Sequence, residues 1–171
     1  MPLTSLPAPD APRELAQAVL PTSLWEKLAP EVARRVHLCC LPMDDVDENA
    51  HLVNALQSHS SVVVQKSLVE GFGLTVTEPM WKGRPVVASA VGGILDQIVD
   101  GEHGLLLEDP YDLQGYADAV IRVLEDGSLA ELLGTAARER VRDVFLGDRH
   151  LIQYVDLFAQ LTGSEQDEAV G

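Results

Sequence analysis

The feature that most constrains the fold is the alternation of short apolar runs with stretches of helical pattern. The run Ser61-Val-Val-Val-Gln-Lys66 has a continuous β-branched centre, which is typical of a parallel strand covered on both faces. Apolar runs at 36–41, 85–89 and 104–107 predict three further strands. Alternating strands and helices predict an α/β chain with a partial Rossmann-like, doubly wound parallel sheet.

Helical patterns fill the intervals between these runs. We expect a helix after the acidic residues 44–49, because acids complement the positive end of a helix, and further helices over 74–82 and 94–99. From 110 to about 161 the pattern is helical, with breaks near 126–127 and 146–147. The predicted organisation is an N-terminal arm with helices over 1–35, a Rossmann-like domain over 36–162 and a disordered tail over 163–171.

Composition excludes several classes of partner and site. The 171 residues carry a net charge of −15, which repels the phosphate backbone of nucleic acid. No apolar run reaches the roughly 18 residues of a membrane span, and residues 1–10 do not have the pattern of a secretory signal. Cys39 and Cys40 are expected to be buried thiols, which suits a cytoplasmic protein. No metal site is expected, since neither these cysteines nor the histidines have ligand spacing.

The glycine-rich stretch after 61–66 is the candidate site. Ligands of open α/β sheets bind beyond the carboxyl ends of the strands. Gly71 and Gly73 allow a tight turn and a close approach of the backbone to a ligand. The helix expected from Leu74 presents free amides at its N-terminus, which can hold a diphosphate without any cationic side chain. This attraction is local and therefore compatible with a negative net charge.

Two glutamates flank this turn. Glu70 precedes it and Glu78 lies within the helix that follows, and a carboxylate is a strong acceptor for sugar hydroxyls. Spacing alone favours a simpler reading, in which one acid caps the helix, the other is solvated, and the glycines form a plain turn. The longer run around these residues is far more specific.

That run is Glu70-Gly-Phe-Gly-Leu-Thr-Val-Thr-Glu-Pro-Met-Trp-Lys-Gly-Arg-Pro-Val-Val-Ala-Ser89, followed by Val91-Gly-Gly-Ile94, Asp96-Gln-Ile-Val-Asp-Gly101 and His103-Gly-Leu-Leu-Leu107. It resembles the C-terminal, donor-binding domain of the family-four retaining glycosyltransferases, also called glycosyl transferase group 1. The sequence is most similar to the trehalose-forming glycosyltransferring synthases, which couple a nucleotide-activated glucose to glucose. The resemblance covers about residues 36–162 and implies the C-terminal half of a GT-B, or twin-Rossmann, enzyme.

The resemblance also implies a role for individual residues. The glutamate at the Glu70 position faces the donor-sugar hydroxyls and is the implied catalytic residue, and the glutamate at the Glu78 position binds the ribose. The implied donor is a nucleotide-diphosphate glucose or a similar compound, bound as substrate without a separate cofactor. The residues implied in donor sugar and phosphate binding are Glu70, Gly71, Phe72, Gly73, Leu74 and Thr75.

Backbone amides carry most of this implied binding. Those at Phe72 and Gly73 meet the sugar, and those at Leu74 and Thr75 meet the distal phosphate. A negative phosphate leaves while the sugar keeps its anomeric configuration, so the expected catalytic contribution is electrostatic stabilisation of that leaving group.

The sequence departs from the family pattern before Val36. The family's donor domain opens with a strand, a glycine–arginine loop and a lysine-bearing helix that grip the diphosphate, and residues 1–35 do not show this pattern. An acceptor-binding domain has no counterpart either, so we expect the isolated chain to be weak or inactive in transfer. If 36–41 is strand three of the expected sheet and 61–66 is strand four, strands one and two, which should lie between them in that sheet, are absent. The unpaired edge predicts a homodimer, or a separate N-terminal domain as partner.

Three functions follow from these observations. The first is the donor-binding domain of a retaining hexosyltransferase, with glucosyl transfer of the trehalose synthase type. The second is a non-catalytic binding or regulatory module derived from such an enzyme, and the third is an interaction domain. Whether the chain is an active enzyme stays open at this point.

Overall fold

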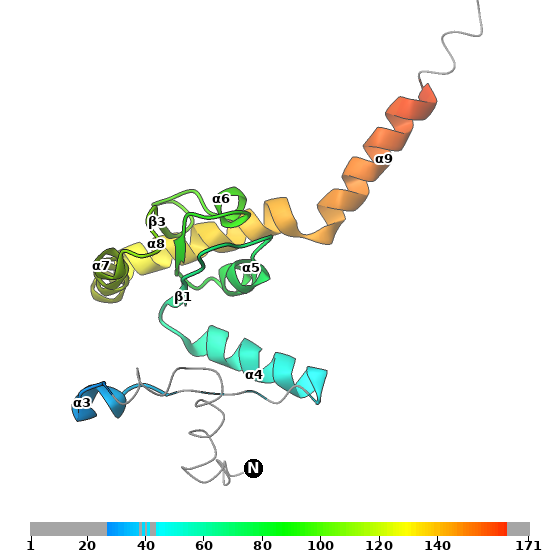
Figure 1. The fold of residues 1–171 in the computed structure, drawn as a ribbon. Helices are drawn as coiled ribbons and strands as arrows, with labels where there is room; N and C mark the ends of the chain where they lie inside the picture. Colours follow the sequence, from blue (N-terminus) through cyan, green and yellow to red (C-terminus); the bar gives the residue numbers. More distant parts are fainter. Residues whose placement is uncertain (1–26, 38, 40, 42–43, 164–171) are drawn as a thin grey trace, which may run out of the picture. The chain divides into compact units, whose positions relative to one another are not determined.

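A computed structural model describes residues 27–37, 39, 41 and 44–163 (Figure 1). The chain divides into two units, residues 1–53 and 54–171. The expected N-terminal arm, most of the helical pattern up to residue 29, and the tail from 164 onward lie outside the described residues. In the first unit, helix α3 spans Pro30–Ala33 and helix α4, Val46–His59, begins.

The acidic lead-in to α4 forms the helix start that the sequence predicts. The side chain of Asp45 accepts hydrogen bonds from the backbone amides of Asp47 and Glu48, both at 3.0 Å. These bonds satisfy two donors of the first turn, which otherwise have no partner within the helix.

The predicted strand over 36–41 is not found. Val36, His37, Cys39 and Leu41 lie in no strand, and the remaining two positions fall outside the described residues. A strand requires a neighbour to pair its backbone groups, and all three strands of the described sheet belong to the second unit. The expected burial of Cys39 is wrong as well, because this free cysteine is exposed.

The second unit is built on a parallel sheet whose strands match the other three predicted runs. The strands are β1 (Val63–Gln65), β2 (Val86–Ser89) and β3 (Leu105–Leu107), in the order β1-β2-β3. Val63 pairs with Val86, and Val87 pairs with Leu105. The α/β class and the parallel sheet are therefore confirmed, with β1 at one edge.

Helices fill the rest of the second unit and agree with the predicted pattern. They are α5 (Leu74–Trp81), α6 (Ile94–Gln97), α7 (Leu113–Glu125), α8 (Gly127–Arg140), a π-helical turn η1 (Val141–Phe145) and α9 (Gly147–Gly163). Helix α6 ends earlier than expected because Ile98 is extended, with φ −114° and ψ 127°. The break at 126–127 arises because Asp126 leaves the helical conformation and caps α8, accepting from the amide of Leu129 at 2.9 Å.

Two hydrophobic clusters cover the two faces of β2. Successive strand residues point to opposite faces, so Val86 and Ala88 join the cluster of α5 and α6, while Val87 joins the cluster of α7. Helix α8 contributes to both, through Ala137 and Leu133. All four residues of β2 are buried, as expected for a strand covered on both sides.

Helix α9 differs from the others in that each of its side chains that the structure describes is exposed. Its large apolar residues are Leu151, Ile152, Tyr154, Val155, Leu157, Phe158 and Leu161. Despite this apolar character, the described part of the chain has no helix with the length and hydrophobicity needed to cross a membrane.

Candidate functional site

The turn at 70–73 lies between β1 and α5, beyond the carboxyl end of the strand. Gly73 is the N-cap of α5 and has φ 83° and ψ 53°, a left-handed conformation that a residue with a Cβ atom adopts at a cost. Space is limited too, since a Cβ on Gly73 would lie 3.2 Å from Oε1 of Gln97. The tight turn expected from the glycines is confirmed.

A second pair of glycines, Gly92 and Gly93, packs against the backbone of this turn. A Cβ on Gly92 would lie 1.8 Å from the carbonyl oxygen of Glu70, and a Cβ on Gly93 would lie 2.3 Å from that of Gly71. The amide of Gly93 donates to the same Gly71 carbonyl at 2.9 Å. Two backbone segments therefore meet directly here, and side chains at these glycines would separate them.

The start of α5 presents a row of amides without acceptors. Among the residues that the structure describes, the amides of Phe72, Gly73, Leu74 and Thr75 donate no hydrogen bond. The next amide, that of Val76, donates to the carbonyl of Gly73 at 2.9 Å. Consecutive free amides at the positive end of a helix form a site suited to an anionic group such as a phosphate.

Glu70 is held at the beginning of the turn. Its Oε1 accepts from the amide of Gly71 at 3.1 Å, and its Oε2 accepts from Oγ of Ser67 at 3.3 Å. Ser67 Oγ in turn accepts from Nε2 of Gln65 at 2.8 Å. An ionised carboxylate has room for further donors, so this fixed, half-buried group can still accept from a ligand hydroxyl.

Glu78 lies four residues beyond Leu74 in α5, so both occupy the same face of that helix. It is exposed, and its Oε2 accepts from Nε2 of Gln57 at 3.0 Å. The same glutamine, on α4, accepts through Oε1 from Nζ of Lys82 at 2.6 Å. The structure therefore places both predicted glutamates on the segment that carries the free amides, with Gln57 as a partner that sequence reasoning did not identify.

Gln97 and Arg140 are the principal residues of this region that sequence reasoning missed. Gln97 is fully buried on α6, and its Nε2 donates to the carbonyl of Phe72. Arg140, at the end of α8, donates through Nε to the carbonyl of Gln97 at 2.6 Å and through Nη2 to that of Asp96 at 2.8 Å. The available signal was a glutamine at the end of a short helix, between the apolar residues Ile94 and Ile98.

Aromatic rings make three further contacts with Phe72 of the turn and with Lys66 at the end of β1. The ring of Phe72, 53% exposed, meets that of Phe145 edge to face at 6.2 Å. At the end of β1, the ammonium of Lys66 lies 5.9 Å and 5.8 Å from the ring centres of Tyr111 and Tyr116. These cation–π contacts place a positive charge at the carboxyl edge of the sheet.

His103 follows α6 and is the buried titratable group of this region. Its Nδ1 accepts from the amide of Val99 at 3.4 Å, and 8% of the residue is exposed. Burial lowers the pKa of His103 below its ordinary value, and the positive charge of Arg140 lowers it further. Glu102 opposes this shift.

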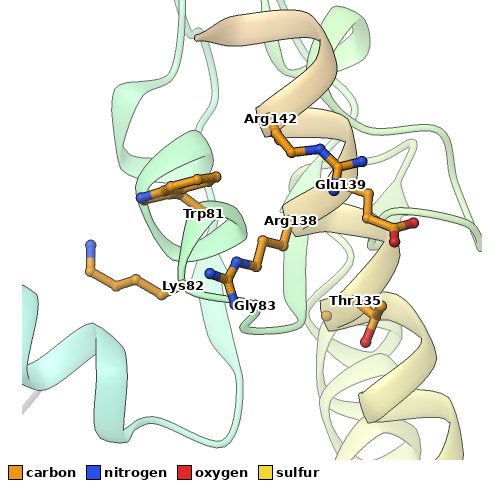
Figure 2. Close-up of a pocket in the computed structure, with 8 residues that line it drawn as sticks. Trp81, Lys82, Gly83, Thr135, Arg138, Glu139 and Arg142 are labelled. Atoms are coloured by element: carbon orange, nitrogen blue, oxygen red, sulfur yellow. The ribbon is translucent and has the colours of Figure 1, made fainter.

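A hollow of about 480 Å³ lies elsewhere, at the C-terminal end of α5 (Figure 2). Arg138 of α8 lies over the ring of Trp81, 5.4 Å from its centre. The turn after α5 approaches α8 closely, since a Cβ on Gly134 would lie 2.3 Å from the carbonyl oxygen of Gly83. Since the free amides are at the other end of α5, this hollow is separate from the predicted donor site.

The described part of the chain does not offer a metal centre, as no group of three or more His, Cys, Asp or Glu side chains there could hold a metal ion. The 70–78 segment offers backbone amides and two carboxylates to a ligand. It suits a ligand with both an anionic part and hydroxyl groups.

Comparison with known proteins identifies the family of the chain. Residues 46–140, more than half of the chain, match the family described as "Glycosyl transferases group 1". The chain is 45% identical over 115 residues to trehalose synthase from Pyrococcus horikoshii, covering 67% of this chain and 27% of that protein. The chain thus spans about a quarter of the length of the curated relatives it matches.

Solved structures show the same fold. Sucrose-phosphate synthase from Thermosynechococcus elongatus superposes with a TM-score of 0.65 at 31% identity, over 89% of this chain and 34% of that one. A TarM variant from S. aureus, solved with fondaparinux, α-GlcNAc-glycerol and UDP, superposes with a TM-score of 0.56 at 30% identity, over 62% and 22% of the two chains. These neighbours are GT-B enzymes, so the expected partial Rossmann-like half of such an enzyme is confirmed. The chain belongs to the glycosyl transferases group 1 family.

Proposed function

We propose that the segment from Glu70 to Glu78 binds a nucleotide-diphosphate sugar, and that the chain is the donor-binding part of a retaining glucosyltransferase of the trehalose synthase type. The observation that carries the proposal is the row of four free amides at 72–75 between two carboxylates. A nucleotide-diphosphate sugar carries a sugar, a diphosphate and a ribose in this order. Its anionic diphosphate would lie at the amides, and the hydroxyl groups on either side would lie near the two carboxylates.

Each part of the donor has a proposed partner. The carboxylate of Glu70 accepts from the hydroxyls of the sugar, and the amides of Phe72 and Gly73 lie beside that sugar. The amides of Leu74 and Thr75 hold the distal phosphate, and Glu78 accepts from the ribose hydroxyls. The Gln57–Glu78 hydrogen bond supports the last role, because it restricts this exposed carboxylate to one face of α5.

The chemistry that these groups supply is electrostatic. Transfer breaks the bond between the anomeric carbon and a phosphate oxygen, and negative charge then builds up on the departing diphosphate. Fixed amides at a helix N-terminus stabilise that charge without reorganising. The dipolar attraction is local, so it can operate on a chain whose net charge is −15.

The relatives support glucosyl transfer as the reaction class and low transfer activity of this chain by itself. The likeness to trehalose synthase favours glucose as the transferred sugar, and the likeness to TarM favours a uridine nucleotide among possible donors. Since the chain spans about a quarter of its relatives' length, we propose that it transfers sugar weakly by itself. An acceptor-binding domain is the partner that would complete the reaction.

Calorimetry of the full chain with UDP-, ADP- and GDP-glucose tests the proposal. We expect saturable heat with at least one donor, and a loss of that heat in the Glu70→Gln/Glu78→Gln double variant. Glu131→Gln, which changes an exposed glutamate of α8, serves as the control. Absence of heat with all three donors at millimolar concentration would overturn donor binding.

The alternative is a binding or regulatory module that keeps the donor site without catalysis. A transfer assay with labelled donor and glucose separates the two functions. Labelled disaccharide supports the enzyme, and donor binding without product supports the module.

A further inference from the structure

The peptide groups of the glycine turn have fixed directions. No peptide bond among the described residues is cis, and in a trans peptide the C=O and N–H bonds point in opposite directions. Gly93 holds the carbonyl of Gly71 through its amide at 2.9 Å, and Gln97 holds the carbonyl of Phe72 through Nε2. The amides of Phe72 and Gly73 are therefore turned away from the 93–97 segment.

The glycine turn does not fix these directions by itself. Rotating the peptide between Phe72 and Gly73 changes ψ of the first residue and φ of the second, and glycine accepts φ of either sign. After such a rotation the carbonyl of Phe72 would point in the direction in which Gly73 now presents its N–H. A carbonyl oxygen there would repel a phosphate or sugar oxygen.

Gln97 has the properties of a residue that prevents this rotation. It is fully buried, and its Oε1 has no hydrogen-bond partner in the described part of the chain. A buried polar atom without a partner lowers stability, so packing alone does not account for a glutamine here. The main chain of Gln97 is itself held by Arg140 at 2.6 Å, which fixes the position from which Nε2 reaches Phe72.

We infer that Gln97 is a positioning residue of the donor site, which holds the Phe72 carbonyl so that the Gly73 amide faces the bound donor. The inference rests on the proposed function for the identity of the ligand. The geometry of the turn in the free protein is independent of that ligand and can be measured without it.

The test compares Gln97→Met and Gln97→Glu with the wild-type chain. Methionine keeps the volume of the side chain and removes the N–H group that bonds to Phe72. Glutamate keeps the shape of the side chain and replaces that N–H group by an oxygen. Gln114→Met is the matched control, because Gln114 on α7 is exposed and its Nε2 donates to Asp118 at 2.8 Å. Circular dichroism checks the fold of each variant.

Residual dipolar couplings give the direction of the Gly73 N–H bond, and the carbonyl ¹³C shift of Phe72 reports its hydrogen bond. We expect both to change in the two Gln97 variants and to stay unchanged in Gln114→Met. Titration with UDP-, ADP- and GDP-glucose is expected to show up to about tenfold weaker binding in the Gln97 variants, the effect of losing an aligned hydrogen bond to the donor sugar.

An unchanged Gly73 N–H direction in both folded Gln97 variants would overturn the inference, even if donor binding were weaker. Absence of donor binding in the wild-type chain would instead overturn the proposed function. The two failures are therefore distinguishable, because the coupling measurement needs no ligand.

Discussion

The backbone of Gly92 lies against the carbonyl group of Glu70 so closely that a Cβ atom on Gly92 would come within 1.8 Å of that oxygen. Gly92 also has φ 52°, which is unfavourable for other residues. The contact joins the candidate catalytic residue to the segment that leads into α6. It makes the shape of the donor turn dependent on a residue more than twenty positions away.

Replacing Gly92 by alanine is therefore expected to lower the free energy of unfolding by about 3 kcal/mol or more, through backbone strain and overpacking together. Gly101→Ala is the matched control, since Gly101 has φ 74° and a Cβ there would meet nothing within 4 Å. Strain alone should cost about 1–2 kcal/mol. Urea denaturation measures both values, and equal losses would contradict the close contact.

Features that depend on neighbouring residues could be predicted from the sequence, whereas features that depend on contacts between distant residues could not. The strands and helices between 61 and 107 were predictable, because β-branched runs and helical periodicity are local signals. The run at 36–41 is also largely apolar, but it lies in no strand where the structure describes it, because strand formation depends on a pairing neighbour.

The candidate site divides in the same way. The glycine turn, Glu70 and Glu78 could be identified because they lie within nine consecutive positions. The contact of Gln97 with Phe72 spans 25 positions and that of Arg140 with Gln97 spans 43. Such contacts arise only when α6 and α8 pack in the folded chain, so no local pattern predicts them.

Stability should depend on pH through His103. Its pKa in the folded chain is lowered by burial and by Arg140, so the unfolded chain binds a proton more readily. The stability contributed by neutral His103 is complete above its ordinary pKa of about 6.5 and is lost as pH falls from there toward the folded pKa.

His103→Gln is expected to reduce the dependence of unfolding free energy on pH between about 7 and 5, the range just around and below that ordinary pKa. Urea denaturation at a series of pH values measures it. An unaltered slope in His103→Gln would show that His103 is not the group responsible.

The two glutamates should affect different parts of the donor. Glu70→Gln is expected to weaken binding of the nucleotide sugar about tenfold while binding of the matching nucleoside diphosphate is unchanged, because only the former has a sugar to contact. Glu78→Gln should weaken both ligands similarly through the ribose. Calorimetry with each pair of ligands distinguishes these patterns, and identical patterns for the two variants would refute the separate roles.

The free edge of β1 should promote self-association. β1 lies at the end of the described sheet order, and an unpaired parallel edge readily accepts another strand. Light scattering at micromolar concentration is expected to show a homodimer. Val64→Lys, on this edge and 45% exposed, should favour the monomer, while Val99→Lys, 44% exposed outside the strands, should not. A monomeric wild-type chain would contradict this expectation.

Donor binding by the amides of residues 72–75 can be observed in an amide-detected NMR titration of the full chain with UDP-, ADP- and GDP-glucose. With at least one donor, we expect the largest saturable shift changes on Phe72, Gly73, Leu74 and Thr75. Changes confined to other regions, such as the hollow between Trp81 and Arg138, or no changes with any donor at millimolar concentration, would contradict it.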